Sequence, residues 1–271
     1  MAKGCPCDDG FCDRQGDDEM GVDTEPEDSS ASSSKDTNIG DPANTIEMKE
    51  IVFVDKICDL GAILSESVQL AVWRRESADT PKFAATLQDP SVIPSSLPTF
   101  EGAVTCDNVR QKLTARLCPR WMLRSKLKRA LPDDEAKELI DELVDLIHIF
   151  GEISQSEAVD VKLHIVDDNG CAYWHQDCVD FRLVKTLRGP CTEWVPPEHS
   201  DATLRRYKFN SKHARSLSHR DVALFKGRGE TLEDDDHLNQ PGIVHRSPRV
   251  MEGSGNVRLV LVLDVPQEWH Y

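Results

Sequence analysis

The 271-residue sequence lacks the segments that would direct a protein into or across a membrane. No uninterrupted apolar run approaches the ~20 residues that a bilayer-spanning helix needs. The N-terminus is acidic rather than arginine-rich, and it has no apolar stretch of the kind found in secretory signals. We therefore expect an intracellular soluble protein with no membrane partner, cytoplasmic by default and with a nuclear location left open.

Several catalytic signatures are also missing. No Ser or Cys lies in a nucleophile elbow, and Gly227-Arg228-Gly229 is too short for a phosphate-cradling loop. The nine cysteines are an odd number, so they indicate reduced thiols rather than a disulfide framework. Cys5, Cys7 and Cys12 could form a thiolate site for a soft metal or a redox site. No fourth ligand is near them, which favours the interpretation that these cysteines have no shared function.

The net charge of −16 is concentrated at the start of the chain. Residues 1–48 carry 13 acidic and 3 basic side chains, a balance of −10, and they show almost no apolar periodicity. Such a composition is typical of disorder. We expect a disordered acidic tail over 1–48 and a single folded domain over 49–271, helical over about 49–151 and rich in strands over about 160–268.

The clearest helix is predicted over 133–150, where apolar residues recur at helical spacing behind an acidic first turn. Gly151 is expected at its C′ position. Residues 68–73 fit a buried strand or a helix equally well. Residues 110–129 carry eight basic and no acidic side chains. A nucleic-acid surface would need more interleaved aromatic residues, so we favour a solvated helix face.

The C-terminal half alternates apolar and polar residues in short runs. Strands are predicted over 161–166, 179–187, 221–227 and 257–264, and the last is expected to be central. Asp168-Asn169-Gly170 indicates a hairpin turn, and Gly189-Pro190 ends the second strand. The predicted fold is α+β, with a double-stranded β-helix (jelly-roll or cupin-like) core that could hold a metal in its mouth.

His175, Asp177 and His245 are the candidate metal ligands. Residues i and i+2 of an extended segment point to the same side, so His175 and Asp177 can face one ion. With a distal histidine they make the facial triad of non-haem Fe(II) sites. The alternative is a set of polar residues at a barrel rim. If Cys171 or Cys178 joined the ligands, Zn(II) would be preferred over Fe(II).

Arg258 follows His245 by 13 residues on the next predicted strand. A similar pattern is found in the 2-oxoglutarate oxygenases, where a basic residue typically follows the distal histidine at a slightly shorter interval. Its guanidinium could bind the distal carboxylate of 2-oxoglutarate. Arg182 is the second candidate for this catalytic role, and a structural ion pair of Arg258 is the alternative.

The chain also resembles the domain of unknown function 1826 family over roughly residues 50–268. The resemblance rests on residues 68–75, 171–177, 182–183, 188–196, 221–227 and 245–248. Cys191 departs from that family's pattern, which usually has Gly there. The resemblance implies that His175, Asp177 and His245 belong to a shared pattern, and it suggests a connection with metals.

These observations lead to one main hypothesis and one alternative. The main hypothesis is an Fe(II)- and 2-oxoglutarate-dependent oxygenase that acts on an unknown small molecule or protein. The alternative is a non-catalytic protein that binds zinc or serves metal homeostasis. A weaker third interpretation is an interaction module whose acidic tail recruits a partner. The sequence gives no indication of the oligomeric state.

Overall fold

The computed structural model describes residues 50–118, 129–169, 171–206, 212–229, 242–249 and 257–266. Met48–Tyr271 forms one compact unit. The predicted acidic tail and its cysteines lie outside the described residues, and so does the stretch 119–128 of the basic segment.

A seven-stranded sheet forms the centre of this unit, in the order β1-β2-β8-β5-β10-β4-β3. Its strands are β1 (Ile51–Val54), β2 (Leu70–Arg74), β3 (Phe100–Thr105), β4 (Ala158–Val166), β5 (Phe181–Arg188), β8 (Asp221–Lys226) and β10 (Arg258–Asp264). Only β1 and β2 pair in parallel. β10 lies between β5 and β4, which confirms the predicted central strand and explains why it is apolar on both faces.

A second, three-stranded sheet has the order β7-β6-β9. Its strands are β7 (Arg215–Ser216), β6 (Glu193–Trp194) and β9 (His245–Arg246). The two sheets and the helices together make a mixed α+β fold, which is the predicted fold class.

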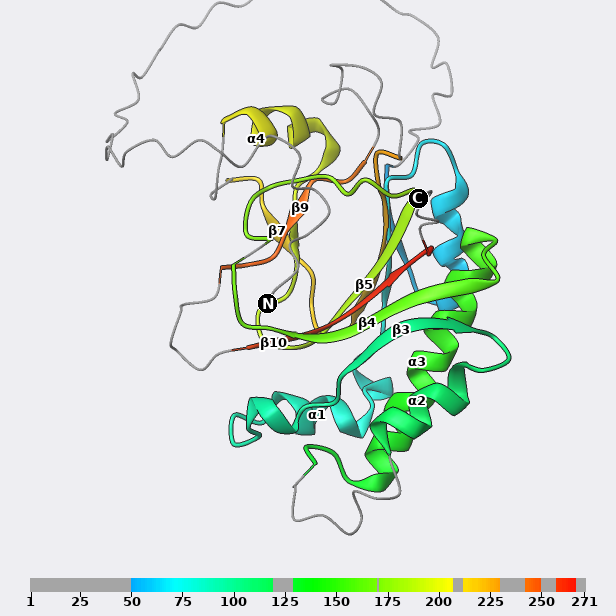
Figure 1. The fold of residues 1–271 in the computed structure, drawn as a ribbon. Helices are drawn as coiled ribbons and strands as arrows, with labels where there is room; N and C mark the ends of the chain where they lie inside the picture. Colours follow the sequence, from blue (N-terminus) through cyan, green and yellow to red (C-terminus); the bar gives the residue numbers. More distant parts are fainter. Residues whose placement is uncertain are drawn as a thin grey trace, which may run out of the picture. The chain divides into compact units, whose positions relative to one another are not determined.

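The helices are α1 (Lys82–Gln88), α2 (Val109–Leu117), α3 (Asp133–Ser154) and α4 (Ser200–Arg206). Within the described ranges, 3₁₀ helices span Ile57–Leu64, Ser77–Asp79, Pro94–Ser96 and Pro197–His199. Helices α1, α2 and α3 lie on one side of the large sheet, while β7 and β9 lie on the other (Figure 1). α3 buries the predicted apolar stripe, including Leu139, Leu143 and Phe150.

Alternation along the strands divides the large sheet into two faces. Leu183, Leu261 and Leu263 belong to the apolar cluster that packs with the helices. Val184 and Val260 belong to a second cluster, which also contains Trp194 of the small sheet. Because successive side chains of a strand point to opposite faces, each residue of β5 or β10 is assigned to the helix face or to the face toward the small sheet.

Three local predictions differ from the structure. α3 continues past Gly151 to Ser154, and Gln155 takes the left-handed cap conformation with φ 54°, because Ile153 extends the buried stripe. The turn expected near Asp168 does not join a hairpin, since β10 lies between β4 and β5. The N-terminal part is not only helical, because it supplies β1, β2 and β3 to the large sheet.

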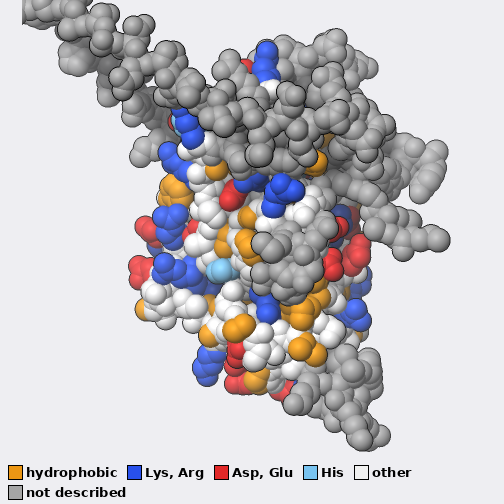
Figure 2. All heavy atoms as spheres, turned by 90° about the vertical axis from the view of Figure 1, so that its left-hand side faces the viewer, with side chains coloured by type: hydrophobic (Ala, Val, Ile, Leu, Met, Phe, Trp, Pro, Cys, Tyr) orange, Lys and Arg blue, Asp and Glu red, His pale blue; other side chains and the backbone are white. Residues whose placement is uncertain are grey.

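Within the described part of the chain, no helix is long and apolar enough to span a membrane. The described basic side chains of the segment 110–129 have partners inside the protein. Arg110 and Arg129 form ion pairs with Asp141 and Asp133. Basic and acidic side chains are interspersed on the face shown in Figure 2. The pairing agrees with a solvated helix face for the described portion of this segment.

Candidate metal centre

His175 and His245 are placed together by backbone pairing. They form an antiparallel bridge in which the His175 N–H donates to the His245 carbonyl oxygen at 3.1 Å and the His245 N–H donates back at 3.0 Å. Directly opposed residues of an antiparallel pair project their side chains to the same side. The two imidazole centroids are accordingly 4.6 Å apart.

The backbone also sets the tautomer of each imidazole. Nδ1 of His175 lies 2.8 Å from the Tyr173 carbonyl oxygen, and Nδ1 of His245 lies 3.1 Å from that of Ile243. A carbonyl oxygen can only accept, so each Nδ1 must carry the proton. Each Nε2 then presents a lone pair. Holding the second ring nitrogen in this way is typical of metal-binding histidines.

Asp177 completes the cluster from the segment that follows His175. Its Oδ2 lies 3.2 Å from His245 Nε2, and its Oδ1 lies 3.7 Å from His175 Nε2. One ligand atom from each of the three residues lies within 4.8 Å of the others, so the predicted convergence of the triad is confirmed. No other group of three such residues in the described ranges meets this criterion.

The segment carrying Asp177 is held against the end of β8 by a glycine. The Arg228 N–H donates to the Asp177 carbonyl oxygen at 2.9 Å. A Cβ at Gly227 would lie 1.9 Å from the Val179 carbonyl oxygen and 2.7 Å from that of Asp177. Only a residue without a side chain permits this approach. Gly227 therefore positions a predicted ligand, although its sequence context gave no indication of that role.

Arg182 connects Asp177 to β10. It donates from Nη1 to Asp177 Oδ1 at 2.6 Å, and from Nε and Nη2 to the two carboxylate oxygens of Asp264 at 2.7 and 2.9 Å. Burial tends to raise the pKa of Asp177, but the neighbouring His245 imidazole and Arg182 guanidinium outweigh that effect and hold this pKa well below its usual range. Asp177 is therefore an anion at neutral pH.

The donor set fits a divalent cation. Burial, followed by the proximity of the His245 imidazole, lowers the pKa of His175, which favours its neutral form. Asp177 Oδ2 is buried and accepts no hydrogen bond from the described residues, although it faces His245 Nε2. With both Nδ1 atoms protonated, two nitrogen lone pairs and one carboxylate converge without a proton between them. A bound cation would satisfy all three groups.

Arg258 lies at the other end of β10 from Asp264, with only 1% of its surface exposed. It donates from Nε to the Pro190 carbonyl oxygen at 2.8 Å, from Nη2 to Thr192 Oγ1 at 3.1 Å, and from Nη1 to Ser247 Oγ. No carboxylate of the described residues lies within ion-pairing distance. Among the described residues, Arg258 therefore has no carboxylate partner for the structural ion pair that was the alternative.

The cysteines beside the triad do not join it. Cys178 Sγ accepts hydrogen bonds from Nε and Nη2 of Arg228 at 3.2 and 2.8 Å, and Cys171 is exposed. Neither is part of the cluster of candidate ligands.

Burial raises the pKa of the Cys191 thiol to about 11, which keeps this thiol protonated.

The comparisons with known proteins place the chain in a family. Residues 54–264 match the family described as "Protein of unknown function (DUF1826)", and the chain belongs to that family. A comparison with curated proteins finds no match.

Three solved structures show weak likeness. A full-length Neurospora crassa protein in complex with alpha-KG is 9% identical, with 79% of this chain and 83% of that chain covered and a TM-score of 0.35. A Pseudomonas putida prolyl-4-hydroxylase is 13% identical, with 70% of this chain and 97% of that chain covered and a TM-score of 0.27.

The non-heme alpha ketoglutarate dependent carbocyclase SnoK from nogalamycin biosynthesis is 12% identical over 60% of this chain and 62% of that chain, with a TM-score of 0.22. Likeness of this strength does not assign an activity to this chain.

Proposed function

We propose that His175, Asp177 and His245 bind one Fe(II) ion and that the protein is an Fe(II)- and 2-oxoglutarate-dependent oxygenase built on a double-stranded β-helix core. The observation that carries the proposal is the convergence of two Nε2 lone pairs on a buried carboxylate oxygen without a hydrogen-bond donor. Two histidines and one carboxylate leave coordination positions open, which is the ligand set of non-haem Fe(II) oxygenases.

A bound Fe(II) ion would supply the activation of O2 together with a 2-oxo acid. The protein's part is to hold the ligands. The carbonyl oxygens of Tyr173 and Ile243 fix the imidazole tautomers. Arg182 occupies Oδ1 of Asp177 and leaves Oδ2 for the metal. Phe225 packs its ring 4.7 Å from that of His245.

Arg258 is the proposed cation for the distal carboxylate of 2-oxoglutarate. A guanidinium has five N–H donors, and the three contacts above leave two of them for a ligand. A buried cation without a carboxylate partner is costly, and an anionic ligand would compensate it. Ser247, which accepts from Arg258, lies two residues past His245 in the sequence, so a single segment connects a candidate ligand with a contact of Arg258.

The proposed substrate is a small molecule or a protein residue, without a role for nucleic acid. All six described cysteines are free, which supports a reducing compartment such as the cytoplasm. The competing function is binding of Zn(II) alone, in a carrier or a metal-homeostasis protein. The two cysteines that would favour zinc lie outside the ligand cluster, so the geometry gives this alternative less support.

Anaerobic calorimetry tests the proposal. Wild-type protein should bind one Fe(II), and the Fe(II)-loaded protein should bind 2-oxoglutarate. His175→Ala should lose both, because it removes a ligand. Arg258→Lys should keep Fe(II) binding and weaken 2-oxoglutarate binding more than tenfold, because an ammonium lacks the guanidinium fork.

His199→Ala is the matched control, because His199 stacks on His213 at 3.4 Å and belongs to no ligand cluster of the described residues. It should leave both affinities unchanged. Tight Zn(II) binding without detectable 2-oxoglutarate binding to the Fe(II)-loaded wild type would exclude the oxygenase and favour the carrier.

A further inference from the structure

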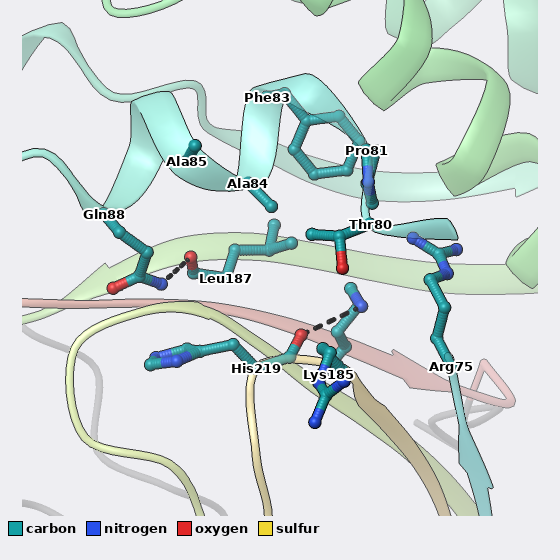
Figure 3. Close-up of a pocket in the computed structure, with 11 residues that line it drawn as sticks. Arg75, Thr80, Pro81, Phe83, Ala84, Ala85, Gln88, Lys185, Leu187 and His219 are labelled. Atoms are coloured by element: carbon teal, nitrogen blue, oxygen red, sulfur yellow. Dashed lines mark hydrogen bonds between the residues drawn. The ribbon is translucent and has the colours of Figure 1, made fainter. Parts of the chain in front are cut away.

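A cavity lies on the helix face of the large sheet, on the opposite face from Arg258 and Arg182. It has a volume of about 220 Å³ and lies between α1 and β5. Lys185 of β5 lines it and is paired in register with Leu261, a member of the helix-face cluster. Figure 3 shows the Lys185 amine and the Thr80 hydroxyl directed into the same space below α1.

The walls of this cavity are apolar. Pro81, Phe83 and Ala84 line it from the α1 side, and Leu187 lines it from β5. The side-chain amide of Gln88 donates to the Leu187 carbonyl oxygen at 2.6 Å, which ties α1 to β5 along one edge of the cavity. The space is many times that of one water molecule, for which about 10–15 Å³ suffices.

Lys185 is an exception on this apolar face. Only 3% of it is exposed, so its charge must be compensated within the protein. Its Nζ lies 3.2 Å from Glu142 Oε1 and 3.4 Å from the His219 carbonyl oxygen. An ammonium has three donors, so these two contacts leave at least one for the cavity. Burial lowers the pKa of Lys185, while Glu142 opposes that effect.

Glu142 is shared between two cations. Its other oxygen, Oε2, accepts from Arg75 at 3.0 Å, and Arg75 also lines the cavity. Lys185, Arg75 and Glu142 therefore carry one positive charge in excess. The nearby Asp221 is already paired with Arg74 at 3.3 Å.

Further nitrogen-bearing side chains lie at the rim of the cavity. Arg220 and His219 line the cavity and are exposed. The Thr80 side chain, which carries a hydroxyl, also lines the cavity and is exposed. The Arg220 guanidinium at the rim, together with the buried Lys185, raises the local concentration of anions.

We propose that this cavity binds a short-chain carboxylate. The carboxylate would accept from Lys185 Nζ and the Thr80 hydroxyl, and the aliphatic part would pack against Phe83 and Leu187. The excess positive charge favours an anion, and the apolar walls favour an organic anion over an inorganic one. The site is independent of the metal centre, so it stands or falls separately from the oxygenase proposal.

Butyrate is the probe, with butyramide as its neutral analogue, and amide chemical shifts of the ¹⁵N-labelled full-length protein are the measurement. Butyrate should shift the signals of Thr80, Ala84 and Leu187 saturably, while butyramide should bind more than tenfold more weakly. Lys185→Met should weaken butyrate binding more than tenfold. Thr80→Val, at the exposed rim, should weaken it three- to tenfold, and this variant tests the site even if Lys185→Met does not fold.

Lys226→Met is the matched control, because Lys226 lies on the adjacent strand β8 and donates to the Ser65 carbonyl oxygen instead. It should bind butyrate as the wild type does. Three results would overturn the proposal: butyrate shifts that map to Ser247 near Arg258, butyramide binding as tight as butyrate binding, or equal affinity for inorganic phosphate. Unchanged affinity in Thr80→Val would likewise refute the proposed contact.

Discussion

Replacement of Arg182 by methionine tests how the metal centre is held together. The change removes three hydrogen bonds to carboxylates, at 2.6, 2.7 and 2.9 Å, while it keeps a side chain of comparable length. Asp177 and Asp264 are only 3% and 7% exposed. Both would remain buried, and Arg182 would no longer compensate their charges.

The size of the effect follows from the burial. Breaking a buried ion pair by removing one partner costs ~3–5 kcal/mol. The Arg182 side chain is 24% exposed, so water can partly replace it, and the lower end of this range applies. We expect Arg182→Met to lower the free energy of unfolding by about 3 kcal/mol, which corresponds to roughly a hundredfold change in the folding equilibrium constant.

The measurement is urea unfolding at pH 7 in the presence of a chelator, followed by tryptophan fluorescence. Arg205→Met is the matched control, because Arg205 pairs with Asp201 at 2.6 Å while both side chains are more than half exposed. An exposed pair contributes less than about 1 kcal/mol. If Arg182→Met and Arg205→Met destabilise the protein equally, Arg182 does not hold the site as argued.

The same variant separates stability from metal binding. Loss of a group that orients a metal ligand typically costs ~10–100-fold in metal affinity. Arg182→Met should show a loss in this range for Fe(II) or Zn(II). Adding Asp264→Asn removes one of the two uncompensated carboxylates and should restore part of the stability without restoring the metal affinity. Full recovery of metal affinity in the double variant would contradict the role given to Arg182.

Three further outcomes are expected. Gly227→Ala should destabilise the protein by about 1–3 kcal/mol, because a Cβ there would lie 1.9 Å from a backbone oxygen, whereas Gly61→Ala, with nothing within 4 Å, should be neutral by urea unfolding. The pKa of Asp177 is lowered on folding, so its stabilising effect is present above pH about 4 and is lost as the pH falls. Asp177→Asn should therefore flatten the acid side of the stability curve. Cys178→Ser should change metal affinity less than threefold in calorimetry, because Arg228 donates to the Cys178 sulfur and Cys178 is not part of the cluster of candidate metal ligands. A tenfold loss would indicate a thiolate ligand.

Local periodicity was enough to predict several elements of this protein. The apolar stripe of α3 and the apolar run of β10 repeat at the spacing of a helix and of a strand buried on both faces. The two-residue spacing of His175 and Asp177 likewise predicted that they lie on one side of an extended segment. Such patterns could be predicted because each depends only on residues a few positions apart.

The pairing of distant segments was decided by the tertiary structure alone. The bridge between His175 and His245 brings the distal histidine to the other two ligands. Arg182 meets Asp264 across 82 residues of sequence. The expected hairpin after β4 failed for the same reason, because a turn signal does not tell which strand will lie alongside.

Lys185 shows the same limit. Its place in β5 predicts which face of the strand it occupies, but α3 supplies Glu142, which compensates its charge, and α1 closes the cavity above it. Sequence periodicity predicts which residues are buried. The partners that make a buried charge tolerable come from the order of strands and the packing of helices, and these depend on contacts across the whole chain.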